Sequence, residues 1–157
     1  TGDASSLYKK FNENEFIKYS KNVLSKKKLD YEDDIPCDFD EIYELSKKSL
    51  ERYLHRKLLN NLVTDTNIIL DIGNKMIEID NKKNNLNVIN SESLEKRKKF
   101  VKYKLDNKLL KKILMGPKYA HWNNAEIGSH IQFFRNPNVF ERKIYESMCY
   151  FHQWYKN

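Results

Sequence analysis

The apolar residues of this chain change their spacing near Val63, and that change restricts the fold more than any other feature of the sequence. Upstream, apolar side chains recur every three or four residues from Phe39 to Leu62, as on one face of a helix. Downstream, Ile68, Leu70 and Ile72 alternate with Asn67, Ile69 and Asp71, which is the period of two of a strand. We therefore predict an α+β fold with N-terminal helices, an antiparallel β-meander and a C-terminal helix.

The first part of the chain is predicted to be helical. Asn12 followed by Glu15 is a capping-box pattern, and it precedes an apolar stripe that continues to residue 24. Asp38 followed by Glu41 opens a second, longer amphipathic helix of about 24 residues. We interpret residues 9–64 as a helical arm and residues 65–157 as an α+β portion packed on it, within a single domain. Residues 1–8 resemble a cloning remnant or a disordered segment.

The second part of the chain is predicted to contain the sheet. Gly73-Asn74 separates two β-rich runs and predicts a tight hairpin, because glycine accepts a positive φ without steric cost. Weaker alternation predicts strands at 86–89 and 101–105, with a loop or short helix at 90–99 between them. Asp106 is predicted to cap a helix that ends near Gly116-Pro117.

The pattern of residues 125–134 fits both periods, and we favour a strand because Gly128 is costly inside a helix. Asn138 with Glu141 is expected to open the last helix. Its buried face is expected to contain Phe140, Ile144, Met148 and Phe151.

The net charge of +7 is concentrated in the second half of the chain, where residues 79–157 carry 16 basic and 7 acidic side chains. Such a patch favours an anionic partner, either nucleic acid or anionic lipid, through the basic 82–118 region. The candidate anion-binding residues are Lys96, Arg97, Lys98, Lys99, Lys102 and Lys104. A composition typical of an AT-rich genome offers a simpler explanation, since only 5 of the 29 basic residues are arginine and 18 residues are asparagine.

Cys37 and Cys149 lie far apart, and their spacing matches no metal-binding or redox motif. A chain of this length does not need a disulfide to fold, so free thiols in a reducing intracellular compartment are favoured, although a bridge between the two stays open. No run of 18 apolar residues exists, which argues against a transmembrane segment.

Residues 119–138 hold the densest group of chemically versatile side chains. His121, Glu126 and His130 are candidate metal ligands, but their spacing matches neither HExxH nor HxH. Ser129 beside His130 lacks the nucleophile elbow of a serine hydrolase, and strand neighbours point to opposite faces. A structural role is the simpler interpretation, with Trp122, Phe133 and Phe134 as core anchors. Arg135 is expected to pair with Glu126 or Glu141. We predict no cofactor and no complete catalytic site.

One resemblance comes from the run Leu109–Leu114, His121-Trp122-Asn123-Asn124-Ala125-Glu126-Ile127-Gly128 and Arg135-Asn136-Pro137. Residues 65–152 resemble the C-terminal accessory domain of metallo-β-lactamase-fold proteins of the lactonase-like and CMP-sialic-acid-hydroxylase-like kind. That resemblance implies a small α+β domain, similar to sterol-carrier lipid-binding folds, that follows a hydrolase core. The family's metal-binding cluster has no match among His55, His121, His130 and His152.

The favoured function is a non-catalytic protein-interaction or accessory domain that binds a partner protein or another copy of itself. The aromatic C-terminal segment motivates this hypothesis, because aromatic residues are enriched at interface hot spots. The candidate interaction residues are Trp122, Arg135, Tyr150, Phe151, Trp154 and Tyr155. Three alternatives stay open: anionic-ligand binding, the substrate-shaping part of a metal-dependent hydrolase using residues 121–135, and an exported helical adaptor from a parasitic protozoan, which composition alone suggests.

Overall fold

The computed structural model describes residues 12–154, so the predicted remnant at 1–8 lies outside the described residues. The chain divides into two compact units, Thr1–Asp33 and Asp34–Asn157, and each is described by itself. Among the described residues, no helix is long and apolar enough to cross a bilayer.

The first unit contains helix α1 (Glu13–Asn22) and the short 3₁₀ helix η2 (Leu24–Lys26). The Asn12 side chain accepts hydrogen bonds from the backbone N–H groups of Asn14 and Glu15, at 3.1 and 3.3 Å. These two bonds satisfy helix N–H groups that have no partner within the helix, and they confirm the predicted N-cap.

The second unit begins with the long helix α2 (Phe39–Leu59), which confirms the strongest helical pattern in the sequence. The Asp38 carboxylate accepts from the backbone N–H of Glu41 at 2.8 Å, as the capping pattern predicts. Ile42 and Tyr53 are fully buried on the inner face of the helix. Helix α2 packs against two helices further along the chain, α4 (Asn107–Met115) and α6 (Arg142–Met148).

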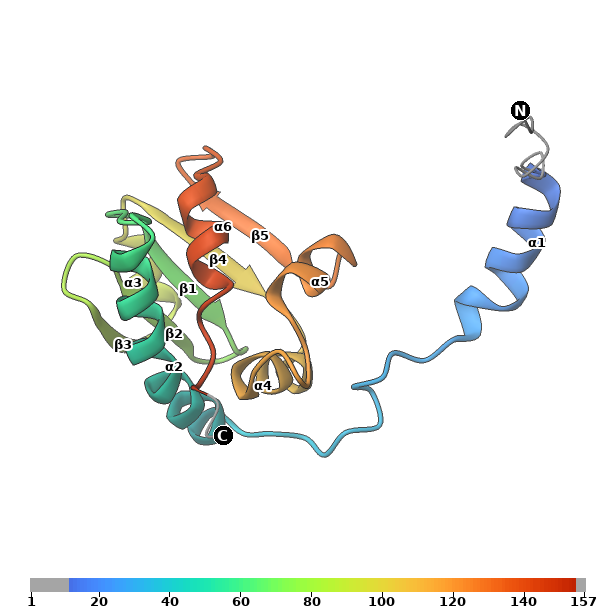
Figure 1. The fold of residues 1–157 in the computed structure, drawn as a ribbon, viewed down its shortest axis with the longest axis horizontal. Helices are drawn as coiled ribbons and strands as arrows, with labels where there is room; N and C mark the ends of the chain where they lie inside the picture. The colour runs from blue at the N-terminus through green and yellow to red at the C-terminus, as the bar shows by residue number, and fades with distance from the viewer. Residues whose placement is uncertain (1–11, 155–157) are drawn as a thin grey trace, which may run out of the picture. The chain divides into compact units, whose positions relative to one another are not determined.

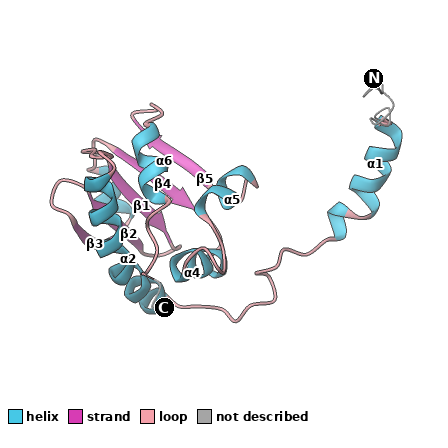
Figure 2. Ribbon diagram, in the orientation of Figure 1, coloured by secondary structure: helices cyan, strands magenta, loops and turns pink. Residues whose placement is uncertain are grey.

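A five-stranded sheet forms the centre of this unit (Figures 1 and 2). Its strands are β1 (Asn67–Asp71), β2 (Met76–Asp80), β3 (Asn85–Ile89), β4 (Phe100–Lys104) and β5 (Gln132–Asn136), in the spatial order β3-β2-β1-β4-β5. The first three strands form the predicted antiparallel meander. Strand β4 departs from it, because it lies beside β1 and runs parallel to that strand. The connection through α3 (Ser91–Glu95) returns the chain to the other side of β1.

The two faces of the sheet carry different cores. On one face the alternating residues Ile68, Leu70, Ile77 and Ile79 are fully buried. On the other face Ile69, Met76 and Ile89 form a smaller core, with Leu94 of α3 and Phe100 packed against it. Both cores follow from the period of two along each strand, which sends neighbouring side chains to opposite faces.

The turn at Gly73 confirms the predicted hairpin. Gly73 has a φ of 94°, in the region that disfavours residues with a Cβ, and its N–H bonds to the Asp71 carboxylate at 3.1 Å. Helix α4 likewise begins after Asp106, whose carboxylate accepts from the N–H of Lys108 at 2.7 Å. It ends at Gly116, where φ is 116°.

The strand predicted over residues 125–134 is wrong in its first half. Helix α5 (Trp122–Ile127) occupies that part, and strand β5 begins only at Gln132. Gly128 follows the helix instead of interrupting it, so its low helix propensity marks an end. Phe134 was expected in the core but is 48% exposed. Because strand neighbours alternate, β5 can direct only one of Phe133 and Phe134 towards the helices.

The last helix starts later than predicted. Helix α6 begins at Arg142, and the expected opening residue Asn138 lies before it. Phe140 therefore lies outside the helix and is 63% exposed, with its ring stacked on Tyr145 at 4.6 Å between centroids. Ile144, Met148 and Phe151 are buried, as the pattern predicts.

Candidate functional site

The predicted interaction residues divide between the core and the surface of the second unit. Trp122 is 3% exposed, and its indole N–H donates to the backbone oxygen of Phe151 at 2.9 Å. Its ring also meets Tyr103 edge-on, with centroids 5.8 Å apart. Phe151 is itself fully buried. Both aromatic side chains therefore support the fold from inside, where a partner protein cannot reach them.

Arg135 of β5 lies among aromatic rings, and the described residues offer it no ion pair with Glu126 or Glu141, contrary to the sequence prediction. Its Nε donates to the Tyr145 hydroxyl at 2.6 Å, and its guanidinium carbon lies 5.3 Å from the centre of the Phe133 ring. Burial raises the pKa of Tyr145, while the hydrogen bond and charge of Arg135 act in the opposite direction. The arginine is thus a partly buried structural element of the β5–α6 contact.

The remaining predicted residues meet helix α2 at the surface. Tyr150 and Trp154 stack with three side chains of that helix, and we call the five residues Arg52, His55, Arg56, Tyr150 and Trp154 the arginine–aromatic surface. The Arg52 guanidinium carbon lies 5.2 Å from the centre of the Trp154 ring and 5.9 Å from that of Tyr150. The Arg56 guanidinium carbon lies 6.0 Å from the centre of the Tyr150 ring, and the centres of the His55 and Trp154 rings are 5.8 Å apart. Trp154 remains 40% exposed, whereas Tyr155 lies outside the described residues.

The six predicted anion-binding residues are not equally available to a ligand. Lys99 pairs with Asp65 at 2.6 Å and Lys102 pairs with Asp71 at 3.2 Å. Lys96, Lys98 and Lys104 are exposed, and Lys102 and Lys104 lie on one face of β4, as predicted. Arg97 also pairs with a carboxylate, that of Glu78. Three of the six predicted residues are therefore neutralised by carboxylates.

Arg97 binds the buried carboxylate of Glu78. Its Nε and Nη2 donate to the two carboxylate oxygens at 2.6 and 2.8 Å, and the side chain of Glu78 is fully buried. Asn67 and Asn87 donate to the same carboxylate at 2.9 and 3.0 Å. Burial raises the pKa of Glu78, but these four donors outweigh it and hold the pKa below its ordinary value.

The candidate metal ligands do not form a metal site in the described part of the chain. His121 precedes α5, Glu126 lies on that helix and His130 follows it. Among the described residues, no group of three or more His, Cys, Asp or Glu side chains could hold a metal ion. Burial raises the pKa of Glu126, and the charge of Arg135 partly opposes that shift. Cys37 and Cys149 are both free thiols.

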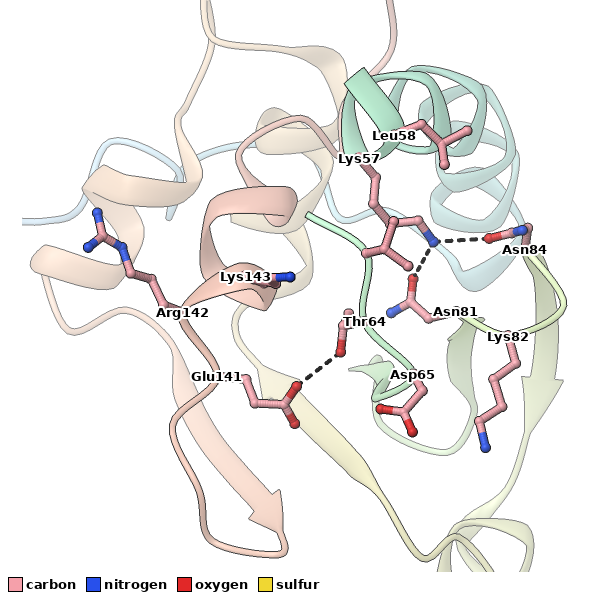
Figure 3. Close-up of a pocket in the computed structure, with 11 residues that line it drawn as sticks. Lys57, Leu58, Thr64, Asp65, Asn81, Lys82, Asn84, Glu141, Arg142 and Lys143 are labelled. Carbon is pink, nitrogen blue, oxygen red and sulfur yellow. Dashed lines mark hydrogen bonds between the residues drawn. The ribbon is translucent and has the colours of Figure 1, made fainter. Parts of the chain in front are cut away.

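A polar pocket that the sequence analysis did not predict lies at the opposite end of α2 from its N-cap (Figure 3). Its cavity volume is about 750 Å³, within the usual range for small-molecule sites. The end of α2, the loop before β1, the β2–β3 turn and the start of α6 contribute its walls. The lining residues are Lys57, Leu58, Val63, Thr64, Asp65, Asn81, Lys82, Asn84, Glu141, Arg142 and Lys143.

Lys57 is the unusual residue of this pocket. Lys57 is only 2% exposed, yet no carboxylate among the described residues pairs with its ammonium group. The ammonium group donates instead to Oδ1 of Asn81 and Oδ1 of Asn84, both at 3.0 Å (Figure 3). Burial lowers the pKa of Lys57, because the charged form loses solvation without gaining a counter-ion.

The amide that holds Lys57 is fixed from several sides. The Asn81 Oδ1 atom also accepts from the Tyr53 hydroxyl at 2.8 Å, and its Nδ2 donates to the backbone oxygen of Thr66 at 2.7 Å. No sequence signal pointed to this network. Its α2 members, Tyr53 and Lys57, lie 24 or more positions before the asparagines of the β2–β3 turn. Only the packing of α2 on the sheet brings them together.

The fold defines an α+β domain with a mixed sheet, most helices over one face, α3 against the other face and a polar pocket at one end. Comparison with protein-family models, with curated proteins and with solved structures found no match in any of the three.

Proposed function

We propose that this chain is a non-catalytic protein-interaction module that self-associates through the arginine–aromatic surface. The observation that carries the proposal is the exposed Trp154 ring, which lies against Arg52 and His55 on the outside of α2. Tryptophan, tyrosine and arginine dominate interface hot spots, because they combine a large apolar area with polar groups. The exposed Leu59, at 66%, lies on the same helix and enlarges the apolar area.

The charge pattern of α2 favours a second copy of the chain as the partner. The exposed Asp40 lies in the first turn of the helix, where Glu41 already pairs with Lys111 at 2.7 Å, whereas Arg52 and Arg56 lie in the second half of the helix. Two such helices that pack antiparallel across a two-fold axis place the acidic end of each beside the basic end of the other. A two-fold interface of this kind uses the same surface on both copies, so one self-complementary helix is sufficient.

The test is the oligomeric state of the full chain, measured by sedimentation velocity over a range of concentrations. We expect concentration-dependent dimers for the wild type and a monomer for Trp154→Ala, whose thermal unfolding should be unchanged because the ring is partly exposed. Tyr119→Ala is the matched control, since Tyr119 is 51% exposed and lies outside the surface. A wild type that stays monomeric at every concentration contradicts the proposal, as does a control variant that dissociates equally.

The resemblance of residues 65–152 to a metallo-β-lactamase accessory domain stays a prediction. An accessory role is compatible with self-association, because both require a binding surface and neither requires catalytic residues in this chain. Binding of nucleic acid or anionic lipid through the basic region also stays a prediction. It now depends mainly on Lys96, Lys98 and Lys104, the cations of that group with exposed side chains.

A further inference from the structure

The pocket at the end of α2 contains more positive charge than its own carboxylates neutralise. Four cationic residues line it, Lys57, Lys82, Arg142 and Lys143, against the two acidic residues Asp65 and Glu141. Clefts lined by one sign of charge concentrate ligands of the opposite sign. The balance within the pocket therefore depends on where the two carboxylates direct their interactions.

Both carboxylates are engaged by groups other than the pocket's cations. Asp65 binds Lys99, which does not line the pocket, at 2.6 Å. Glu141 accepts hydrogen bonds from the hydroxyls of Thr64 and Thr66, at 3.0 and 2.5 Å, and also lies 3.4 Å from Lys99. These partners hold the pKa of Glu141 below its ordinary value, although burial opposes them. Lys99 offsets only one of the two negative charges, because the threonine hydroxyls are neutral, and Lys82 also contributes to lowering the pKa of Asp65. The remaining negative charge offsets one of the pocket's three lysines, so a positive excess remains.

The lysines keep donor groups for a ligand. An ammonium group has three N–H donors, and Lys57 uses two of them on Asn81 and Asn84. Lys82 and Lys143 are exposed side chains at the rim, and neither forms an ion pair among the described residues. Arg142 differs from them, because its Nε binds Glu146 at 2.5 Å. Three lysines from α2, the β2–β3 turn and α6 thus line one cavity, and the Lys82 side chain extends away from Lys57 (Figure 3).

A buried, uncompensated cation costs folding free energy, so its presence beside a cavity requires an explanation. The two asparagine oxygens accept its hydrogen bonds and the centre of the Tyr53 ring lies 5.4 Å from its Nζ, but none of these groups carries a full negative charge. An oxyanion in the cavity would supply that charge and accept the third N–H. Leu58 and Val63 add apolar wall, which suits an organic ligand that carries the anionic group.

We propose that this pocket binds a small organic molecule through a phosphate or carboxylate group, which Lys57 holds at the wall and Lys82 and Lys143 hold at the rim. The site is separate from the arginine–aromatic surface and does not depend on self-association. It also differs from the six candidate anion-binding residues of the sequence analysis, none of which lines the pocket, although Lys82 lies within the basic 82–118 region.

Pyrophosphate and citrate are the probes, because they carry the two kinds of oxyanion at high charge density. Binding is followed on the full chain by calorimetry and by the shift in thermal unfolding temperature. We expect one probe to bind at a single site with a rise in unfolding temperature, and which one binds distinguishes phosphate from carboxylate recognition. Absence of binding by both probes overturns the proposal.

Substitutions separate the pocket from general attraction to a basic protein. Lys82→Ala and Lys143→Ala alter exposed side chains and should each weaken binding about tenfold, the usual effect of losing one charge-assisted hydrogen bond. The double variant Lys96→Ala and Lys98→Ala removes two exposed charges outside the pocket and should leave binding unchanged. An equal loss in this control means that the protein attracts anions non-specifically, and overturns the assignment.

Lys57→Met tests the buried cation, but this variant can also disturb the fold. A titration of the wild-type protein therefore accompanies it, with the Lys57 side-chain NMR signal followed as a function of pH. Bound probe should raise the pKa of Lys57 towards its ordinary value of 10.5, because the anion stabilises the ammonium form. An unchanged Lys57 titration in the presence of a bound probe overturns the proposed contact.

Discussion

Two buried charged residues show how differently one fold treats ionised side chains. Glu78 is surrounded by four donors, including a bidentate arginine, whereas Lys57 has two neutral amide acceptors and the Tyr53 ring but no counter-ion. Glu78 therefore resembles a completed structural site, since both of its oxygens have partners and its charge is balanced. Lys57 resembles an incomplete one, and that difference is the reason for assigning a ligand to its pocket.

The Glu78 cluster predicts a specific loss of stability in acid. The folded-state pKa of Glu78 is lower than its ordinary value of 4.5, so its contribution is fully present above that value. The contribution is lost as the pH falls through the lowered pKa. We expect the unfolding temperature of the wild type to decrease as the pH falls below 4.5, and that of Glu78→Gln to decrease less steeply. Parallel pH profiles for the two proteins would contradict the account.

At the scale of elements, helix ends matched the sequence where a side chain caps them. The caps at Asn12, Asp38 and Asp106 were recognisable because short polar side chains bond N–H groups two or three residues along. Helix α6 has no side-chain cap, and its start was misplaced at Asn138. The error at residues 125–134 has a related cause, since a period of two and a period of 3.6 cannot be distinguished over a six-residue helix.

The Asp38 cap gives the clearest prediction for a single element. Asp38→Ala removes the acceptor of the Glu41 N–H and should lower the free energy of unfolding by about 1 kcal/mol. Urea denaturation at neutral pH measures the change. Glu51→Ala, an exposed position within α2, is the control and should alter stability by less than about 0.5 kcal/mol. A cap variant as stable as the control would show that the bond contributes nothing.

At the scale of the whole molecule, the C-terminal segment secures the second unit. Phe151 packs edge-on against Tyr53 of α2 at 5.7 Å between ring centroids, and its backbone oxygen accepts from Trp122. Gln153 donates its backbone N–H to the carbonyl oxygen of Leu114 at 2.9 Å. One short segment therefore joins α2, α4 and α5, so Phe151, which was predicted for partner binding, has a structural role in this unit.

Trp122 tests this arrangement. Trp122→Ala removes a nearly buried indole together with its hydrogen bond to Phe151, and should lower the free energy of unfolding by roughly 3–5 kcal/mol. Thermal and urea unfolding of the full chain measure it. Trp154→Ala is the matched tryptophan control, because that ring is 40% exposed, and it should change stability by less than about 1 kcal/mol. Equal losses from the two variants would contradict the division into core and surface.

The sequence by itself determined the fold class, the long helix α2, the hairpin at Gly73 and the buried apolar residues of the sheet and of α4. Those features depend on local spacing and on capping or turn residues, which act within a few positions. The sequence did not determine the buried face of every helix, because α1 buries none of its apolar stripe and α2 buries Ser46, Ser49 and Lys57 but exposes Leu58. Tertiary structure alone decided three features: the parallel pairing of β4 with β1, which aromatic residues are buried and which are exposed, and the pocket around Lys57. Each of these depends on contacts between distant segments, whose formation is governed by how helices and strands pack and not by any local pattern.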